Sequence, residues 1–366
     1  MASDRPRAAA VTALGMATAA GDGTRPTTAA LRAGIVRLVE IPGLMLPTPD
    51  GRSIPAVGGV AEALWSPQRD ARGLARLAAL GGAALHDLAR QPALPDLASA
   101  PLHLALPPLD RPGVPSDLDR TLPVLLGAEA PLDNLASRIR LYPGGHAAVG
   151  LALAAALDDL DRGAPAVIAG GADSLVEPAA VRAFHAAGRL SLRPRRTGFL
   201  PGEGAGFLLL EPLDRALARG ATVLCLLEAP ATADDPVPLD GDAPCTGTGL
   251  SAAIEATAFA LDDHGAAIGL CYCDLNGEPA RSEELASAIV RSLRHVPRPL
   301  ALRHIADGLG DTGAASMALS IGAAATALHR EQTRTSGVLV TASSDRGLKA
   351  SVHLRAHRPG AEEIKR

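Results

Sequence analysis

Aromatic residues, cysteines and long apolar runs are all scarce in this sequence. Aromatic side chains occupy 2% of the 366 positions, so stacking on bases or sugars is not expected to drive binding. The formal net charge is −4 with both signs scattered along the chain, which argues against nucleic acid or anionic lipid as a partner. No stretch reaches the roughly 18 uninterrupted apolar residues of a membrane span. Because the N-terminus also lacks a signal-peptide pattern, a cytoplasmic location is expected.

The four cysteines are Cys225, Cys245, Cys271 and Cys273, and none of them is in a Cys-x-x-Cys motif. Cys271 and Cys273 are two residues apart and would share one face of a strand. We therefore expect buried, reduced thiols. No zinc site, other metal site or cofactor is predicted.

Small and branched apolar residues are abundant instead. Apolar residues make up 47% of the chain, and the mean hydropathy is +0.16, as in a well-buried globular protein. The length exceeds what one small core can organise, so two fused halves or one large layered domain are expected.

The stretch from Arg140 to Gly150, with the apolar run that follows it to Asp173, organises the chain. Its pattern predicts a strand, a sharp glycine turn, a helix over 147–162 and a second buried strand from Ala166. His146 stands where the turn becomes the helix. The helix dipole and free N–H groups at such a position favour an anion or an activated nucleophile.

Alternating strands and helices are predicted on both sides of this stretch, which indicates parallel crossovers in an α/β fold. The predicted strands cover residues 8–18, 101–106, 137–141, 166–169 and 207–211. The predicted helices cover 27–33, 66–91 with a Ser66-Pro67 start, 117–122 ended by Pro123, 178–187 and 213–219. Residues 41–58, which contain several prolines, are expected to form an irregular loop.

Taken together, several segments resemble the β-ketoacyl-acyl-carrier-protein synthases of the thiolase-like superfamily, and the similarity covers nearly the whole chain. Residues 11–18 with 31–34 resemble the opening strand and first helix of that family. Residues 163–173 resemble its strand ending in Ala-Gly-Gly-Ala-Glu, and residues 198–211 its Gly-Phe-x-x-Gly-Glu-Gly-Ala-Gly segment. Residues 247–261 resemble the first helix of its C-terminal repeat.

The resemblance implies a thiolase-like α/β fold of five layers, αβαβα, built from two pseudo-symmetric halves. The halves would be residues 1–222, similar to the synthase N-terminal domain, and residues 223–366. The resemblance also implies a dimer, either of identical chains or with an active synthase.

The sequence has no cysteine at the position where this family carries its nucleophile. Active synthases carry a Cys at the strand-to-helix turn, and counting back from Gly163 places that slot on His146, or on Gly145 or Tyr142 if the turn differs in length. None of these registers contains a Cys. An acyl-imidazole is far less stable to water than a thioester, so His146 would be a poor store for an acyl chain.

Both catalytic histidines of the family are also expected to be absent. The first falls on the segment 271–284, where the slot holds Cys273 or Asp274. The motif of the second histidine corresponds to residues 306–313, where Asp307 replaces the histidine. The family's closing glycine-rich loop corresponds to residues 341–347, where the glycine-rich motif is lost. Supporting structural roles are expected for a set of neighbouring residues: Gly145, Gly202, Glu203, Gly204, Gly310 and Gly313.

Acidic and amide side chains occur in the segments where the catalytic motifs of the family are replaced, and two interpretations of them are open. They could gather into an acidic pocket for a cation or cationic group, or they could be ordinary turn and cap residues, which is the simpler hypothesis. The residues are Asp274, Asn276, Glu278, Asp307, Asp311 and Asp345.

Loss of condensing activity is therefore predicted, leaving a non-catalytic accessory, scaffold or dimer partner, as chain-length factors are. The segment 274–278 resembles a second group more closely, the degenerate thiolase-like proteins of specialised loci, including type VI secretion effector modules. There the role would be that of an accessory or chaperone. A third hypothesis is an acyltransferase or other enzyme with a site rebuilt around His146. The corresponding partners are an active synthase, an acyl carrier protein or a secretion effector.

Overall fold

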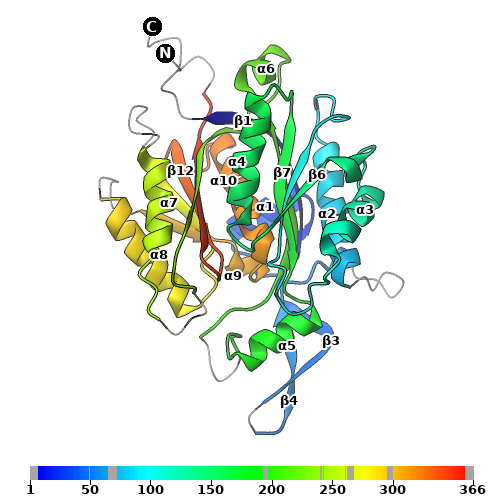
Figure 1. Cartoon of the computed structure of the whole chain (residues 1–366), viewed down its shortest axis with the longest axis vertical. Coiled ribbons are helices and arrows are strands. Elements are labelled where there is room, and N and C mark those ends of the chain that lie inside the picture. Colours follow the sequence, from blue (N-terminus) through cyan, green and yellow to red (C-terminus); the bar gives the residue numbers. More distant parts are fainter. Residues whose placement is uncertain are drawn as a thin grey trace.

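The computed structural model describes residues 7–48, 50–64, 72–192, 197–239, 241, 243–259, 261, 268–294 and 300–358. The predicted helix start at Ser66-Pro67 lies outside these residues. Within them, helices surround a large mixed sheet (Figure 1). No helix in the described ranges is long and apolar enough to cross a membrane.

The first half contributes five principal strands in the spatial order β6-β5-β7-β8-β1. Strands β5, β6 and β7 are parallel, and β8 is antiparallel to both β7 and β1. A two-residue strand, β2 (Gly21–Asp22), pairs with the end of β1. The bounds are β1 (Ala8–Thr18), β5 (Leu102–Leu106), β6 (Ile139–Pro143), β7 (Val167–Ser174) and β8 (Glu203–Glu211).

The second half repeats this topology in the order β11-β10-β12-β13-β9. Strands β10, β11 and β12 are parallel, and β13 is antiparallel to both β12 and β9. The first strands of the two halves, β1 and β9, pair antiparallel and join the sheets. The bounds are β9 (Cys225–Asp234), β10 (Ile268–Cys273), β11 (Ala301–His304), β12 (Gly337–Ser343) and β13 (Leu348–Arg355).

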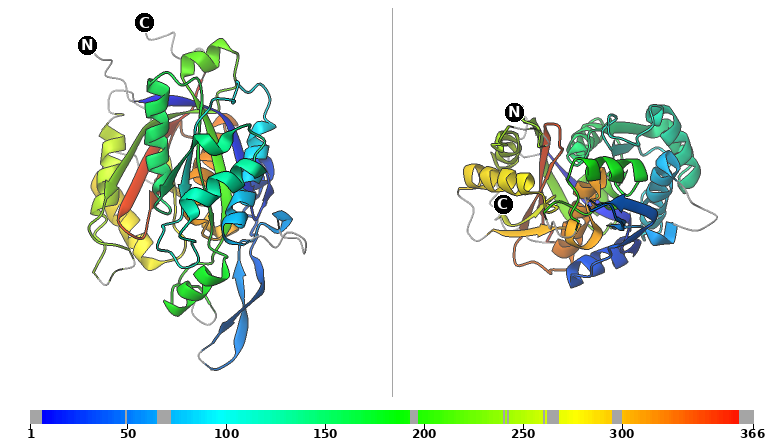
Figure 2. Two further views of the ribbon diagram at one scale, coloured as in Figure 1. Left: turned by 45° about the vertical axis from the view of Figure 1, so that its right-hand side comes forward. Right: turned by 90° about the horizontal axis from the view of Figure 1, so that it is seen from below.

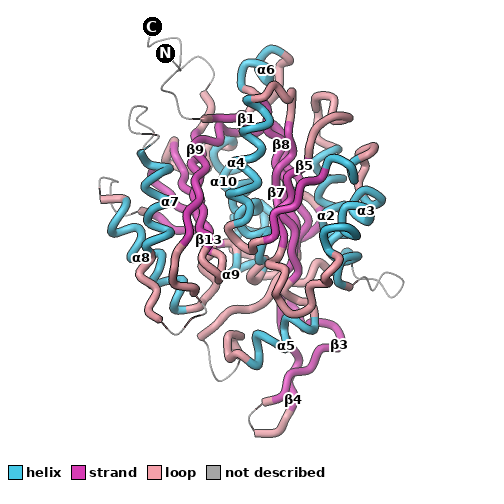
Figure 3. The backbone as a smooth tube through the Cα atoms, viewed as in Figure 1, coloured by secondary structure: helices cyan, strands magenta, loops and turns pink. Residues whose placement is uncertain are grey.

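Helices form an inner layer and two outer layers around these strands. Helices α4 and α10 lie in the middle, α2 and α3 cover one side, and α7 and α8 cover the other (Figures 2 and 3). The helices are α1 (Thr24–Ala33), α2 (Gly73–Ala89), α3 (Leu118–Glu129), α4 (Ala148–Asp161), α5 (Pro178–Ala186), α6 (Leu213–Ala218), α7 (Thr248–Phe259), α8 (Pro279–Ser292), α9 (Ala306–Leu309) and α10 (Ser316–His329). Short 3₁₀ turns occupy Glu62–Leu64, Leu135–Arg138 and Gly313–Ala315.

Helices α4 and α10 are buried because they are apolar on nearly every face. Both contribute to one core cluster with strands of both halves. Small residues allow the close approach: a Cβ added at Gly150 would lie 2.5 Å from the Ala350 Cβ of β13. This helical layer, buried between the two halves of the large sheet, confirms the predicted thiolase-like fold class. The boundary between residues 222 and 223 remains a prediction.

The irregular loop predicted over residues 41–58 is wrong. A hairpin forms there, with β3 (Val39–Pro47) antiparallel to β4 (Ser53–Gly58). It projects from the body of the molecule next to α5 (Figure 1). Prolines are tolerated because each strand of a two-stranded ribbon has one edge that needs no hydrogen-bond donor.

The predicted helix end at Pro123 is also wrong, since α3 continues to Glu129 with Pro123 inside it. A proline within a helix costs about 3 kcal/mol. Burial of Leu118, Leu122 and Leu126 offsets this cost, at roughly 1.5–3 kcal/mol for each fully buried leucine. These leucines share a core cluster with α2.

Candidate functional site

His146 lies between the end of β6 and the start of α4. The turn is held by Leu106 of β5, whose carbonyl accepts the N–H groups of Gly144 (3.1 Å) and Gly145 (3.0 Å). Gly145 has φ 78°, in the left-handed region that favours glycine. The His146 side chain is thereby directed into the interior between the two halves, where the residue is 7% exposed.

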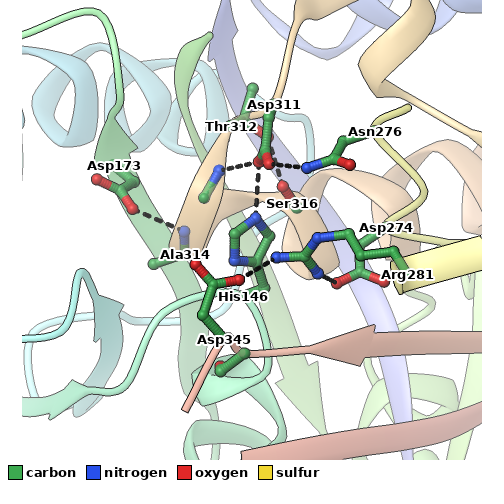
Figure 4. A network of polar contacts seen from close by, with 12 residues as sticks. His146, Asp173, Asp274, Asn276, Arg281, Asp311, Thr312, Ala314, Ser316 and Asp345 are labelled. Atoms are coloured by element: carbon green, nitrogen blue, oxygen red, sulfur yellow. Dashed lines mark hydrogen bonds and ion pairs between the residues drawn. The ribbon is translucent and has the colours of Figure 1, made fainter. Parts of the chain in front are cut away.

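The buried partner of His146 is Asp311, from the loop between α9 and α10. The imidazole Nε2 lies 2.7 Å from Asp311 Oδ1. Asn276 donates its Nδ2 hydrogen to Asp311 Oδ2 (2.7 Å), and the Gly313 N–H donates to Oδ1 (2.9 Å). Figure 4 shows the Asp311 carboxylate between His146 and Asn276.

Nε2 of His146 is the donor of this pair, because the Asp311 carboxylate can only accept a hydrogen bond. Burial by itself lowers the pKa of His146, but the Asp311 carboxylate more than offsets this and the pKa is raised. Burial by itself raises the pKa of Asp311, yet His146, Arg281 and Asn276 hold that pKa well below its usual range. A protonated Nε2 that donates to Asp311 has no lone pair for attack on a carbonyl group.

Two glycine loops fix the position of Asp311. Its N–H donates to the Leu200 carbonyl (2.8 Å), and its own carbonyl accepts the Gly202 N–H (2.7 Å). Gly310 has φ 74°, and a Cβ there would lie 2.5 Å from the Pro201 carbonyl oxygen. A Cβ on Gly202 would lie 2.4 Å from the Leu309 carbonyl oxygen. Both glycines therefore permit a backbone contact that no other residue allows.

Arg281, in the first turn of α8, neutralises the acidic side of the site. It is 2% exposed and donates to Asp274 (2.8 Å), Asp345 (2.7 Å) and the Ser343 carbonyl (2.6 Å). Burial by itself raises the pKa of Asp345, but Arg281 and Arg189 hold it well below its usual range. Figure 4 shows Arg281 lying between the two aspartates.

Arg189 links the same cluster to the loop after α5. It contacts Glu278 (2.7 Å) and Asp345 (2.8 Å), and its guanidinium packs over the rings of Phe184 and Phe199. The structure therefore brings together five of the six acidic and amide residues that the sequence singled out. Their carboxylates face Arg281, Arg189 or His146, so the cluster is not an open acidic pocket.

Asp307, predicted to take the place of the second catalytic histidine, lies outside this cluster. Its side chain is 78% exposed and pairs with His304 Nδ1 at 3.2 Å. Asp311, four residues later, is the residue that reaches His146. The Gly310-Asp311-x-Gly313 spacing is the sequence signal that could have pointed to Asp311. In the structure both glycines have positive φ.

Cys273 and Asp274, the two candidates for the other histidine position, lie in different surroundings. Cys273 packs in the cluster that contains Leu285 and Leu250 of α8 and α7, and burial raises its pKa well above the usual range. Asp274 accepts hydrogen bonds from Arg281 and from the Ser343 N–H. Asn276, two residues further along, is the side chain of this segment that contacts Asp311.

Glu203 and Gly204 begin strand β8 and have structural contacts. Glu203 is fully buried and accepts hydrogen bonds from Arg76, from the Ser174 hydroxyl (2.9 Å) and from the Ala61 N–H (2.9 Å). A Cβ at Gly204 would lie 2.9 Å from the Ala17 carbonyl oxygen of β1. Glu203 thus ties α2 to the sheet, with its oxygens satisfied by these donors.

A pocket of about 140 Å³ opens beside His146 and is lined by Gly144, Gly145, Arg189, Ser344 and Asp345, among others. None of the four cysteines lines it. Ser344 Oγ accepts the Ala147 N–H at 3.0 Å, so a backbone donor at the start of α4 is already engaged. Tyr142 is turned elsewhere, with its hydroxyl 2.8 Å from His103 Nδ1.

Sequence comparison finds β-ketoacyl synthases. The profile of the family described as "Beta-ketoacyl synthase, N-terminal domain" matches residues 146–216. A putative polyketide beta-ketoacyl synthase 1 from Streptomyces halstedii is 35% identical over 140 residues, or 35% of this chain and 32% of that protein. A 3-oxoacyl-[acyl-carrier-protein] synthase 2 from Staphylococcus aureus is 36% identical over 113 residues, or 28% of this chain and 27% of that protein. The matched regions thus span about a third or less of these relatives.

Solved structures of ketosynthases have the same fold over almost the full chain. The ishigamide ketosynthase/chain length factor has a TM-score of 0.74 at 22% identity, covering 96% of this chain and 100% of that one. A type II polyketide synthase acyl-carrier protein in complex with its ketosynthase has a TM-score of 0.72 at 17% identity, covering 97% and 100%. The chain therefore has the fold of these ketosynthases, and its residues 146–216 are similar to the β-ketoacyl synthase N-terminal domain.

Proposed function

We propose that this chain is a β-ketoacyl synthase homologue without condensing activity, which acts as a non-catalytic dimer partner of a ketosynthase. The observation that carries the proposal is the buried ion pair of His146 and Asp311 at the start of α4. Asn276 and the Gly313 N–H also contact Asp311, which supports the proposal that His146, at the expected nucleophile position, is engaged in a structural contact.

Thioester condensation requires a nucleophile and donors for the developing oxyanion. The Nε2 hydrogen of His146 is directed to Asp311, and a carboxylate 2.7 Å away would repel a negatively charged intermediate. The Ala147 N–H is held by Ser344. These contacts support loss of the condensing reaction.

The partner role is supported by the free edge of the first sheet. Strand β6 is the last strand on that side among the described residues, and its residues are half-buried or exposed. A sheet edge with unpaired N–H and C=O groups is a template for a strand from another chain. One structural neighbour is described as a ketosynthase/chain length factor, an arrangement consistent with a ketosynthase-like partner.

Catalysis is tested by incubating the purified chain with acyl- and malonyl-carrier protein. We expect no acyl adduct by mass spectrometry and no release of carbon dioxide. A competent ketosynthase serves as the positive control for the substrates. A stable adduct, or carbon dioxide release that His146→Ala abolishes, contradicts the proposal.

Partnership is tested by light scattering at micromolar protein, with the chain alone and mixed with a ketosynthase encoded in the same locus. We expect a two-chain mass in at least one of these samples. Leu141→Asp, on β6, should reduce it, whereas Val124→Asp, at a position on α3 that is 65% exposed, should not. A monomeric mass in every sample contradicts the partner role without bearing on the catalytic prediction.

A further inference from the structure

A second pocket, of about 540 Å³, lies at the outer edge of the second sheet. It shares no lining residue with the pocket beside His146. Its walls come from strands β10 and β11, helix α1, helix α10 and the loop that follows α10. Its volume is within the range of small-molecule sites, about 300–1,000 Å³.

The walls follow from the periodicity of the elements that form them. On the parallel strands, Leu270 is opposite Ala301 and Tyr272 is opposite Arg303, so the period of two places these pairs on one face. Helix α10 and its C-cap residue present a matching face, spaced three and four residues apart, with Ala323, Thr326 and Ala327 of the helix and Arg330 at the C-cap. Three of these four side chains are small, which leaves the space open.

The corresponding corner of the first half is filled. There, His103 of β5 contacts both Tyr142 of β6 (2.8 Å) and Asp159 of α4 (3.1 Å). Arg140 closes the group by donating to Asp159 (2.7 Å). Because the two halves share one topology, the open corner of the second half is a difference in side chains rather than in fold.

The charge around this pocket is unbalanced. Among the residues that the structure describes, four arginines line it, Arg32, Arg303, Arg330 and Arg334, and no aspartate or glutamate does. Among the described residues, none of these four guanidinium groups has an ion pair or a hydrogen bond. By contrast, Arg76, Arg111, Arg189 and Arg281 each contact a carboxylate.

We propose that this pocket binds a small organic anion that carries at least two acidic groups on an apolar body. Its phosphate or carboxylate groups would contact the four arginines, whose planar forks match such oxyanions. Its apolar body would pack against Leu270, Tyr272 and Ile305, which line the same pocket. This inference does not rest on the proposed function, because binding requires neither turnover nor a partner chain.

Binding is tested with 8-anilinonaphthalene-1-sulfonate, an apolar anion that fluoresces when it leaves water. We expect saturable fluorescence that pyrophosphate or citrate displaces; displacement by one alone distinguishes a phosphate ligand from a carboxylate ligand. Arg303→Ala with Arg330→Ala should weaken binding by about tenfold or more. Arg120→Ala with Arg182→Ala, which removes the same charge elsewhere on the surface, should leave binding unchanged.

Filling the pocket is a second test that keeps the charge constant. Ala327→Trp should weaken binding of the fluorescent probe, while pyrophosphate binding measured by calorimetry should fall less. Circular dichroism confirms folding, and the single variant Arg334→Ala replaces any double variant that does not fold. Probe binding that the pocket variants leave unchanged, or that neither pyrophosphate nor citrate displaces, overturns the proposal.

Discussion

His146 Nε2 lies 2.7 Å from Asp311 Oδ1, although 165 positions separate the two residues in the sequence. One residue comes from each half of the molecule, and both are almost completely buried. The contact therefore joins the halves through a pair of opposite charges held away from water. Replacing either residue alone leaves the other charge without its partner.

Asp311→Asn tests the energy of this pair. Removing one partner of a buried ion pair typically costs about 3–5 kcal/mol of unfolding free energy, measured by urea denaturation. The double variant His146→Gln with Asp311→Asn should lose less than the sum of the two single variants. Asp307→Asn, whose parent side chain is 78% exposed, serves as the control and should change stability by about 0.5 kcal/mol or less. Strict additivity of the single variants would contradict coupling between the two residues.

Stability should fall at alkaline pH because of His146. Its folded-state pKa is raised above the ordinary value of 6.5, so its contribution is complete below that value and is lost as pH rises through the folded-state pKa. The difference in unfolding free energy between the parent chain and His146→Gln should shrink as pH rises above 6.5 and through the raised folded-state pKa. A difference that stays constant or grows would show that the imidazole is not preferentially protonated in the folded chain.

Arg281→Met should destabilise the chain strongly. Asp274 and Asp345 would lose a buried guanidinium that contacts both of them, and breaking such a network costs on the order of 3–5 kcal/mol. Chemical denaturation measures the loss, and Arg182→Met on the surface of α5 is the matched control. A loss of unfolding free energy in Arg281→Met as small as that in the control variant would contradict this role.

Gly310→Ala tests the combined cost of an unusual backbone conformation, φ 74° and ψ 175°, and of crowding. Gly310 and Gly220 have φ values of 74° and 71°, but a Cβ meets Pro201 at 2.5 Å at the first position and nothing within 4 Å at the second. Gly220→Ala should cost about 1–2 kcal/mol for the left-handed conformation. Gly310→Ala should cost clearly more in the same denaturation experiment, because the backbone must also move. Equal losses would show that the contact with Pro201 is not restrictive.

Cys245 should be the cysteine that reacts most readily in the native protein. It is half-buried, whereas Cys225, Cys271 and Cys273 are buried, and burial raises the pKa of Cys271 to about 12. Because the thiolate is the reactive form, iodoacetamide should modify Cys245 first, as mapped by mass spectrometry. Cys245→Ser should remove this early modification. Rapid labelling of Cys271 or Cys273 would contradict their burial.

The sequence predicts most of the strands and helices because apolar periodicity and glycine punctuation act locally. The strand Ala8–Thr18 and the helix that follows His146 are present as expected. The predicted helix end at Pro123 and the predicted loop over residues 41–58 are wrong because the energetic cost of a proline depends on its neighbours in the fold. Three buried leucines stabilise α3, and the unpaired ribbon edges accommodate the hairpin prolines.

The site is less predictable because its contacts are made across loops. Motif spacing placed Asp307 and Cys273 or Asp274 in the histidine slots, while the structure presents Asp311 and Asn276 to the buried centre. The deciding feature is the backbone contact between Gly310 and Pro201, which fixes the loop that carries Asp311. Such a contact joins segments that are distant in the sequence, and the glycine is the only feature of the sequence that indicates it. The hypothesis that the acidic residues are simple turn residues missed Arg281 and Arg189 for the same reason.

The charge balance at His146 also restricts the order in which such a site can change over generations. In an ancestor with neutral residues at these two positions, Asp311 without His146 would have been a buried carboxylate that lacked one of its partners. Sequences that differ from this one at position 146 are therefore expected to differ at position 311 as well. Correlated substitution at positions 146 and 311, which come from opposite halves, would indicate that one electrostatic contact constrains both.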